Sequence, residues 1–299
     1  MYINKILFYL RWGFRCKILN KKIPLNSSII INDKCNLNCR HCVVSNLGYK
    51  DLDFERVKND ILILYNFGSR MLIITGGEPF LWKNNKYSLE DVVRYAKKIG
   101  FFRVVICTNG TLGLNSSADY LWVSLDGFVE EHNYIRGDIY EKVIKNIVLS
   151  NHKNIFINFT ISKINHEKFE VAAKNILRIK NVRGIFFHLF TPYIGSDMNL
   201  KLDRKERKIV LDKLHSFKKK YFLKVINTFA GIKALKENNW ERNSWSSVTM
   251  SQGKLSFCCC RNGIYNKETC DNCGCSPAVE SWVLQRIKLG AVIENFRFL

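Results

Sequence analysis

Apolar, β-branched segments alternate with helical patterns along most of this chain, and this alternation constrains the fold more than any other feature. The apolar segments occupy residues 27–32, 71–75, 102–108, 120–125, 154–162 and 184–190. Helical patterns occupy residues 53–67, 88–99, 138–150, 166–179 and 203–220. Strands that alternate with helices form parallel βαβ units. The sequence therefore predicts an α/β core over residues 25–225, built as an open doubly wound sheet or as a partial (β/α)6 TIM-like barrel.

Polar clusters follow the second, third and fourth of these strands. The sequence reads "TGGEPF" at 75–80, "TNG" at 108–110, "SLDG" at 124–127 and "HNYIRG" at 132–137. Glycines let a ligand approach the backbone closely, and Glu78 can accept hydrogen bonds from an ammonium group. Turns would explain any one cluster, but they explain poorly why all of them lie at one rim. We therefore expect a binding site at the carboxyl ends of the strands.

The chain has eleven cysteines, and nine of them form two groups. Cys16 and Cys107 lie apart, and we interpret both as small buried residues. No apolar run approaches the roughly 20 residues that span a bilayer, and the first residues lack a small-residue cleavage site. We therefore expect a cytoplasmic protein. Cytosolic thiols stay reduced, so clustered cysteines there more often bind metal or act in catalysis.

The first group, Cys35, Cys39 and Cys42, has C-x3-C-x2-C spacing and directly follows the first predicted strand. Thiolates are the usual ligands of iron–sulfur clusters. A cubane cluster has four irons, so three protein thiolates leave one iron open to a substrate or cofactor. The alternative is a zinc site that His41 or a distant cysteine completes.

This cysteine motif, followed by "GGEP" after the second strand, resembles the two hallmark motifs of the radical S-adenosylmethionine (SAM) enzymes. In that family an apolar or aromatic residue often precedes the last cysteine, whereas His41 stands there in this chain. The resemblance covers about residues 27–225. It implies that Cys35, Cys39 and Cys42 hold a [4Fe–4S] cluster whose fourth iron is chelated by SAM. One electron, from a donor such as flavodoxin or ferredoxin, would then cleave SAM to a 5′-deoxyadenosyl radical that abstracts a hydrogen atom from the substrate.

The resemblance also implies which residues contact SAM, and it assigns no catalytic side chain. The amino group would lie against "GGEP", and the expected SAM-binding residues are Gly76, Gly77, Glu78, Pro79, Thr108, Asn109, Ser124, Asp126 and Arg136. Ser124 and Asp126 are candidates for the ribose or the carboxylate. Arg136 would pair with the carboxylate, or it is a surface residue after a turn. The last strand would lie near the adenine, and His188 there is interpreted as a core histidine rather than a base.

Residues 226–299 are predicted to be a separate, small, cysteine-rich extension. "GKLSFCCC" indicates a hairpin that ends in Cys258, Cys259 and Cys260, and adjacent residues of a strand point to opposite faces. This segment resembles a shortened SPASM or twitch-type extension, although it lacks the full array of seven cysteines. The resemblance implies a second [4Fe–4S] cluster, and the expected ligands are Cys258, Cys270, Cys273 and Cys275. A zinc knuckle is the alternative.

Residues 1–24 are predicted to form a basic amphipathic helix, with helical periodicity over 2–23 and no acidic residue before Asp33. This composition is typical of a helix in a membrane interface, or of one packed on the outside of the core. The formal net charge of +21 could attract anionic partners, or it could reflect an AT-rich genome. We do not expect a nucleic-acid partner, because no motif for one is present.

Three functions remain open from the sequence. The first is peptide or protein modification or cofactor biosynthesis by radical chemistry on an unidentified substrate. The second is radical chemistry on a lipid or isoprenoid at the membrane surface, which the N-terminal helix favours. The third is a non-catalytic zinc-binding scaffold, which would leave "GGEP" without a role.

Overall fold

Eight strands form one sheet in this computed structural model, which describes residues 2–242, 244–257, 266–286, 290, 291 and 294. The strand order is β10-β9-β1-β2-β5-β6-β7-β8, and every neighbouring pair is parallel except β10 with β9. The strands are β1 Asn26–Ile30, β2 Met71–Thr75, β5 Arg103–Thr108, β6 Tyr120–Ser124, β7 Ile155–Ile161, β8 Val182–Leu189, β9 Ser247–Ser251 and β10 Lys254–Ser256. The prediction of an α/β fold of the partial TIM-barrel kind is confirmed.

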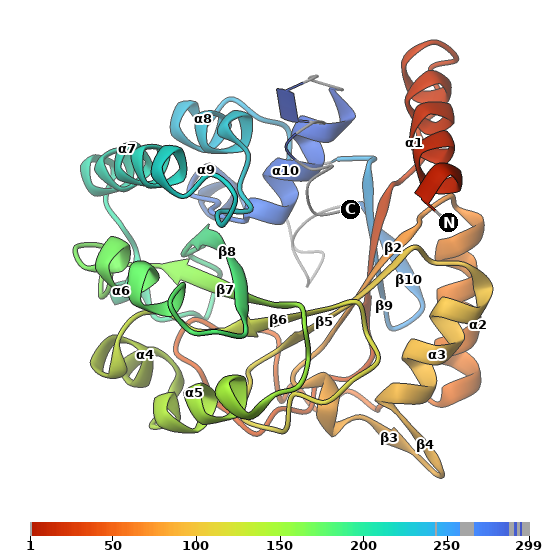
Figure 1. The fold of residues 1–299 in the computed structure, drawn as a ribbon, viewed down its shortest axis with the longest axis horizontal. Coiled ribbons are helices and arrows are strands. Elements are labelled where there is room, and N and C mark those ends of the chain that lie inside the picture. The colour runs from red at the N-terminus through yellow and green to blue at the C-terminus, as the bar shows by residue number, and fades with distance from the viewer. Residues whose placement is uncertain (1, 243, 258–265, 287–289, 292–293, 295–299) are drawn as a thin grey trace.

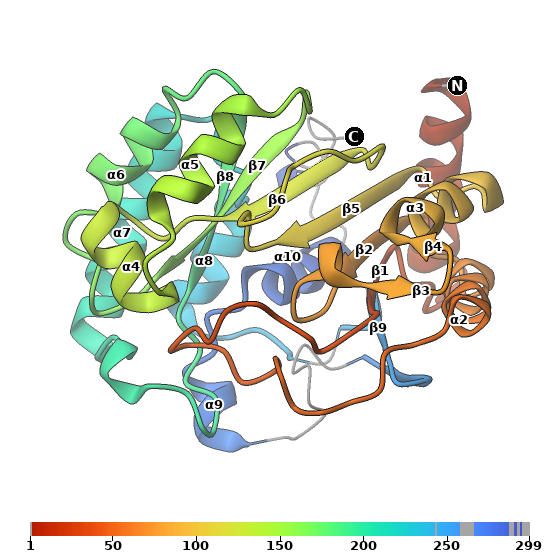
Figure 2. The ribbon, with the colours of Figure 1, turned by 90° about the horizontal axis from the view of Figure 1, so that it is seen from below.

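Helices cover the outer face of this curved sheet (Figure 2). The α-helices are α1 Tyr2–Lys17, α2 Phe54–Asn66, α3 Leu89–Ile99, α4 Val129–Arg136, α5 Tyr140–Leu149, α6 Phe169–Ile176, α7 Arg204–Lys220, α8 Phe229–Glu237, α9 Lys267–Asp271 and α10 Ser276–Gln285. Two 3-10 turns, η1 Pro79–Leu81 and η2 Met198–Leu200, and the small hairpin β3 Lys83–Asn84 with β4 Tyr87–Ser88 complete the described elements. Among the described residues, no helix is both long and apolar enough to cross a membrane.

The two faces of the sheet differ in polarity. Side chains that point outward, such as Ile29, Leu72 and Ile157, are fully buried beneath the helices. Their neighbours in sequence point inward because successive residues of a strand face opposite sides. Several of these inward residues are polar, and they border a cavity rather than the core. The hydrophobic core therefore lies between sheet and helices, and the inner face is left for binding.

The hairpin β9–β10 extends the sheet beyond β1. β9 runs parallel to β1, with Asn26 opposite Ser247 and Ile30 opposite Ser251. Gln252 and Gly253 make the turn to β10 with φ of 47° and 73°, which is the left-handed pair that a tight hairpin favours. A hairpin is present, but its strands span 247–256, so it begins before the predicted segment 253–260, and the sequence did not indicate that it joins the central sheet. The predicted end of the hairpin, Cys258, Cys259 and Cys260, lies outside the described residues. The domain division at residue 225 stays a prediction.

Four helices, α4, α8, α9 and α10, were not predicted from the sequence, and the first helix is shorter than expected. The helix α4 occupies part of the expected "HNYIRG" turn, and Glu131 accepts a hydrogen bond from the Phe128 N–H at its start. The helices α8, α9 and α10 lie in the C-terminal segment 226–299, for which no helix was predicted. The first helix ends at Lys17, and the chain then reverses through Asn20 with a positive φ of 53°.

Candidate active site

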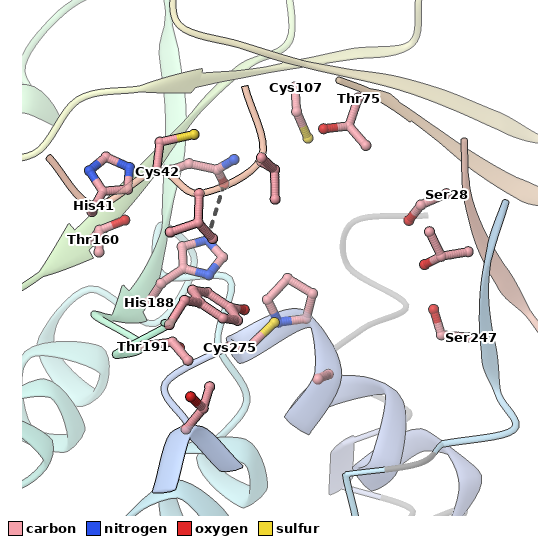
Figure 3. A pocket seen from close by; sticks show the side chains of 18 of the residues that line it. Ser28, His41, Cys42, Thr75, Cys107, Thr160, His188, Thr191, Ser247 and Cys275 are labelled. Carbon is pink, nitrogen blue, oxygen red and sulfur yellow. Dashed lines mark hydrogen bonds between the residues drawn. The ribbon is translucent and has the colours of Figure 1, made fainter. Parts of the chain in front are cut away.

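A cavity of about 470 Å³ lies on the inner face of the sheet (Figure 3). Seven strands and the first turns of α10 line it, together with residues 41–44 of the loop that follows β1. The side chains labelled in Figure 3 are Ser28, His41, Cys42, Thr75, Cys107, Thr160, His188, Thr191, Ser247 and Cys275. Among the described residues that border this cavity there is no Asp or Glu. Hydroxyl, amide and imidazole groups therefore dominate its polar surface.

The three cysteines of the first group lie close together on the loop after β1. Burial raises the pKa of Cys39 to about 11, the positive charge of Arg136 lowers it, and the other two thiols raise it further. The three thiols are thus near enough for the charge of one to change the pKa of another. No three His, Cys, Asp or Glu side chains in the described part of the chain are arranged to hold a single metal ion. Of the three neighbouring thiols, Cys42 borders the cavity. This donor set suits a polynuclear iron–sulfur cluster.

Gly76 and Gly77 hold the base of this cysteine loop. A Cβ atom on Gly76 would lie 2.2 Å from Asn32 Oδ1, and one on Gly77 would lie 2.3 Å from the carbonyl oxygen of Asp33. The Gly77 N–H donates to the Asn32 carbonyl at 3.0 Å, and the Glu78 N–H donates to the Lys34 carbonyl at 2.8 Å. The two glycines are therefore required where backbone packs directly on backbone.

Glu78 is fully buried and joins the ends of two strands. Its carboxylate accepts hydrogen bonds from Thr108 Oγ1 at 2.9 Å, from the Asn109 N–H at 2.7 Å and from the Phe80 N–H at 3.1 Å. Burial raises the pKa of Glu78, and these three hydrogen bonds lower it in part. Both oxygen atoms already accept hydrogen bonds within the protein. The structure thus places Glu78 and Thr108 together, in contacts that fix the rim.

Asn109 reaches from the end of β5 to the cysteine loop. Its amide nitrogen donates to Asn36 Oδ1 at 2.9 Å and lies 3.8 Å from Cys35 Sγ. Its Oδ1 accepts from the N–H and the hydroxyl of Thr111 at 2.9 and 2.7 Å. The orientation of the amide is therefore fixed, with its donor directed at a thiol that we expect to ligate the cluster.

Asp126 and Arg136 form a buried ion pair beneath Cys39. The Arg136 Nε donates to Asp126 Oδ2 at 2.6 Å, and the Thr160 N–H donates to Asp126 Oδ1 at 2.7 Å. Burial is the largest single effect and raises the pKa of Asp126, but the charges of Arg136, His41 and His132 and the Arg136 hydrogen bond together hold that pKa below its usual value. Arg136 is only 8% exposed, so the interpretation as a surface arginine is wrong. Its charge also acts on Cys39 and Cys42.

Alternation along the strands identifies cavity residues that the sequence interpretation missed. Cys107 borders the cavity and is half-buried, so its interpretation as a small buried residue is wrong, whereas Cys16 is buried as expected. His188 also faces the cavity, with Nε2 3.4 Å from Asn158 Oδ1 (Figure 3). The interpretation of His188 as a core histidine is therefore wrong. Ser124 lies two residues beyond Trp122 on β6, on the same inner face.

The described cysteines of the second group lie next to one another around the start of α10. Cys270 and Cys273 are buried, whereas Cys275 is half-buried and borders the cavity. The Cys275 N–H donates to Cys273 Sγ at 3.5 Å. Cys258, with its neighbours 259 and 260, lies outside the described residues, so its predicted role as a ligand stays a prediction.

Two arginines surround these cysteines. Arg207 donates to the Cys273 carbonyl at 2.7 Å, and Arg242 donates to the Cys270 carbonyl through Nε at 3.0 Å and Nη2 at 2.7 Å. Burial lowers the pKa of Arg207 to about 10, Cys273 raises it, and the like charge of Arg242 lowers it further. Neither guanidinium forms an ion pair with a carboxylate in the part of the chain that the structure describes. Two neighbouring cations are thus left without an acidic partner.

The family model that describes the radical SAM superfamily matches residues 29–176. The chain is 29% identical to Fe-coproporphyrin III synthase of Methanosarcina barkeri over 75% of this chain and 62% of that protein. It is 31% identical to AdoMet-dependent heme synthase of the same organism, over 52% of this chain and 47% of the relative. Antilisterial bacteriocin subtilosin biosynthesis protein AlbA of Bacillus subtilis is 28% identical over 50% of this chain and 35% of that protein. The chain thus spans between about a third and three fifths of these relatives.

Solved structures share the fold at low sequence identity. Streptococcus suis SuiB bound to the precursor peptide SuiA matches with a TM-score of 0.65 and 13% identity, over 94% of this chain and 69% of SuiB. The structure titled anSMEcpe with bound AdoMet matches with a TM-score of 0.57 and 21% identity, over 72% of this chain and 67% of that one. These matches extend beyond the residues of the family model, so the similarity in fold includes the C-terminal part.

Proposed function

We propose that this chain, whose residues 29–176 match the radical SAM superfamily model, is an enzyme that binds a [4Fe–4S] cluster at Cys35, Cys39 and Cys42 together with SAM. The observation that supports this best is the mutual proximity of the three thiols on the loop at the carboxyl end of β1, where Cys42 borders the cavity. When bound, the cluster and SAM supply one-electron cleavage of the sulfonium bond and hydrogen-atom abstraction from a substrate.

The residues of this chain position that chemistry and shield it from water. Gly76 and Gly77 hold the cysteine loop against β2. Asn109 directs an N–H toward Cys35, and the buried Arg136 places a positive charge near Cys39 and Cys42. Both contacts favour the deprotonated form of the thiols, which is the form that ligates iron. We retain Gly76, Gly77, Pro79, Ser124 and Arg136 as proposed contacts of SAM.

Glu78, Thr108 and Asp126 act in this proposal as positioning residues. Their polar atoms are engaged in hydrogen bonds with the protein, as described above. Contact of any of these three with SAM would require an exchange of those bonds. We therefore give the side chain of Asn109 and the backbone of residues 76–78 more weight in holding the cluster and SAM.

We propose a second [4Fe–4S] cluster at Cys270, Cys273 and Cys275, with Cys258 as the fourth ligand. The paired guanidinium groups of Arg207 and Arg242 support this, because two neighbouring cations without acidic partners are costly unless an anionic group lies beside them. A thiolate-ligated cluster would be such a group. An electron donor such as flavodoxin or ferredoxin would be the redox partner.

The substrate is proposed to be a polar molecule with an anionic group. The cavity offers hydroxyl groups, His41, His188 and the partly exposed Arg242, and no acidic side chain among its described residues. A peptide or a carboxylate-bearing precursor of a cofactor would fit this surface. The names of the relatives agree with either class, since they include a heme synthase and a bacteriocin biosynthesis protein.

The decisive experiment measures iron and sulfide per chain after anaerobic reconstitution. The wild type is expected to hold about eight irons and the Cys35/Cys39/Cys42→Ala variant about four, from cubane stoichiometry. Reduced wild type should convert SAM to 5′-deoxyadenosine and methionine, and the variant should not. Retention of all iron by the variant would exclude the cysteine loop as the cluster site. Colourless protein that contains only zinc would favour the non-catalytic scaffold instead.

A further inference from the structure

The helix α1 has two apolar sides, and only one of them packs on the protein. Trp12 and Cys16 are buried, and Phe8 and Tyr9 pack beside them. The Trp12 Nε1–H donates to the Ile23 carbonyl at 2.9 Å, and the Phe8 ring meets the Phe102 ring edge-on at 5.2 Å. The helix is therefore held against the core by this first face.

The second face is exposed to solvent. Ile6, Leu10, Phe14 and Ile18 follow one another at intervals of four residues, which places them along one side of a helix and its C-terminal extension. Their exposed fractions, with that of Leu7, are large: Ile6 47%, Leu7 58%, Leu10 64%, Phe14 55% and Ile18 66%. We call these five residues the apolar stripe. No described part of the chain covers it.

Basic residues flank the apolar stripe. The exposed cations here are Arg11, Arg15, Lys17, Lys21 and Lys22, and none of them forms an ion pair with a carboxylate of the described residues. No acidic residue occurs before Asp33. An exposed apolar stripe with unpaired cations beside it is the pattern of a helix that lies in the interface of an anionic bilayer.

We propose that α1 docks the protein on an anionic lipid surface, with the apolar stripe among the headgroups and the cations beside the phosphates. A second copy of the chain fits less well, because a symmetric contact would bring two sets of cations together without acidic partners. The partner of opposite charge that accepts an exposed apolar helix is the anionic membrane.

This docking face lies at the end of the sheet opposite the cysteine loop. α1 packs against Phe102, just before β5, and against Leu25, just before β1. The cysteine loop follows the other end of β1. Docking would therefore tether the protein and leave the rim with the cysteines accessible, so the inference does not depend on the proposed chemistry.

Sedimentation of the full chain with vesicles tests the inference. We expect binding to vesicles that contain phosphatidylglycerol and little binding to vesicles of phosphatidylcholine alone. Leu7/Leu10/Phe14→Ser should reduce binding at least about tenfold, and Arg11/Arg15→Gln should reduce it by about tenfold and weaken its salt dependence. Val148/Leu149/Val171→Ser is the matched control, since those side chains on and near α5 and α6 are 56%, 67% and 57% exposed, and it should bind like the wild type.

Other outcomes would overturn the proposal. Equal sedimentation of the wild type and both α1 variants would exclude the apolar stripe as the docking face. Absence of vesicle binding together with a concentration-dependent dimer that the Ser variant abolishes would assign the stripe to a second copy. Thermal unfolding and iron content should match the wild type in all variants, because every substituted side chain is exposed. If the reconstituted wild type binds anionic vesicles but does not cleave SAM, that result counts against the proposed function and not against the docking of α1.

Discussion

The cysteine loop is held in place by single atoms of its neighbours rather than by a large apolar contact. At Gly77 the missing side chain is the essential feature, since the carbonyl oxygens of Asp33 and Lys34 lie 2.3 and 2.4 Å from where a Cβ would be. Backbone atoms cannot move aside as a flexible side chain can. The distance between β2 and the loop is therefore set by the absence of one methyl group.

Gly77→Ala is expected to destabilise the fold by about 1–3 kcal/mol and to displace the loop, with loss of about four irons per chain from the first site. Gly113→Ala is the matched control, because no atom lies within 4 Å of a Cβ added at Gly113, and it should keep the iron of the wild type. Iron and sulfide analysis with urea unfolding checks both. Full iron content in Gly77→Ala would show that the loop tolerates a wider spacing.

Asp126→Asn is expected to destabilise the cluster-free protein by about 3–5 kcal/mol. The substitution leaves the buried guanidinium of Arg136 without its charge partner. The new amide group would also direct an N–H donor at either the Arg136 guanidinium or the Thr160 N–H. Both of these are donors that need an acceptor. The measurement is equilibrium unfolding in urea.

A double-mutant cycle identifies the interaction. Asp126→Asn/Arg136→Gln should cost clearly less than the sum of the two single variants, because the second change removes the stranded charge. Additive costs would mean that the two side chains act independently, which the 2.6 Å contact contradicts.

At the scale of elements, α10 is attached to α8 by a buried carboxylate. Glu280 of α10 accepts hydrogen bonds from the N–H and the hydroxyl of Thr228, the N-cap of α8, at 2.8 and 2.7 Å. Burial raises the pKa of Glu280 to about 7 from 4.5, although these hydrogen bonds lower it in part. The position of the second cysteine group therefore depends on a carboxyl group that is costly to ionise.

This attachment should make stability depend on pH. Between pH 4.5 and about 7 the folded protein keeps a proton on Glu280 that the unfolded chain has released. The free energy of unfolding therefore falls as pH rises through that window. From pH 4 to pH 8, the free energy of unfolding of the wild type should fall by up to about 3 kcal/mol relative to that of Glu280→Gln.

Urea unfolding of the cluster-free proteins at several pH values measures this shift. Glu268→Gln, which removes an exposed carboxylate of α9, controls for the general effect of a lost negative charge. A constant difference between wild type and Glu280→Gln over the whole range would mean that Glu280 ionises as easily in the folded protein as in the unfolded chain.

Local pattern was enough to predict the six core strands and the five helices between and after them, because each is a run of residues with its own periodicity. It was not enough for contacts between distant segments. The sequence of β9 is that of an ordinary short strand. Its position in the sheet follows from pairing with the open edge of β1, which the local sequence does not indicate. Inward and outward residues were also not distinguished, and for that reason His188 and Cys107 were assigned to the core. The motif cysteines were found because their spacing is local, whereas Arg207 and Arg242 reach the second group from distant elements.

At the scale of the whole molecule, the C-terminal part completes the barrel-like sheet. β9 supplies hydrogen bonds along the whole of β1, and α10 buries Val279, Trp282 and Val283 against the rest of the core. A chain that stops at residue 239 would expose the edge of β1 and the apolar surface that α10 covers. We expect that truncated chain to aggregate or to lose cooperative unfolding.

Size-exclusion chromatography and thermal unfolding distinguish the sheet contact from the cysteines. Cys270/Cys273/Cys275→Ser in the full chain removes the proposed ligands but keeps β9 and α10, and it should elute like the wild type and fold cooperatively. A truncated chain that is equally soluble and cooperative would instead support residues 226–299 as a separate domain.

The pairing of β1 with β9 also has a consequence for biosynthesis. Asn26 leaves the ribosome about 220 residues before its partner Ser247, which at ordinary rates of translation is a delay of roughly 10–45 s. Throughout that delay one edge of the first strand has no neighbour, and such edges promote aggregation. Closure of the sheet must wait until β9 has been synthesised, and contacts so distant in sequence form slowly. The nascent chain is therefore predicted to depend on chaperones, and β9 is the last of the strands that line the cavity to be added.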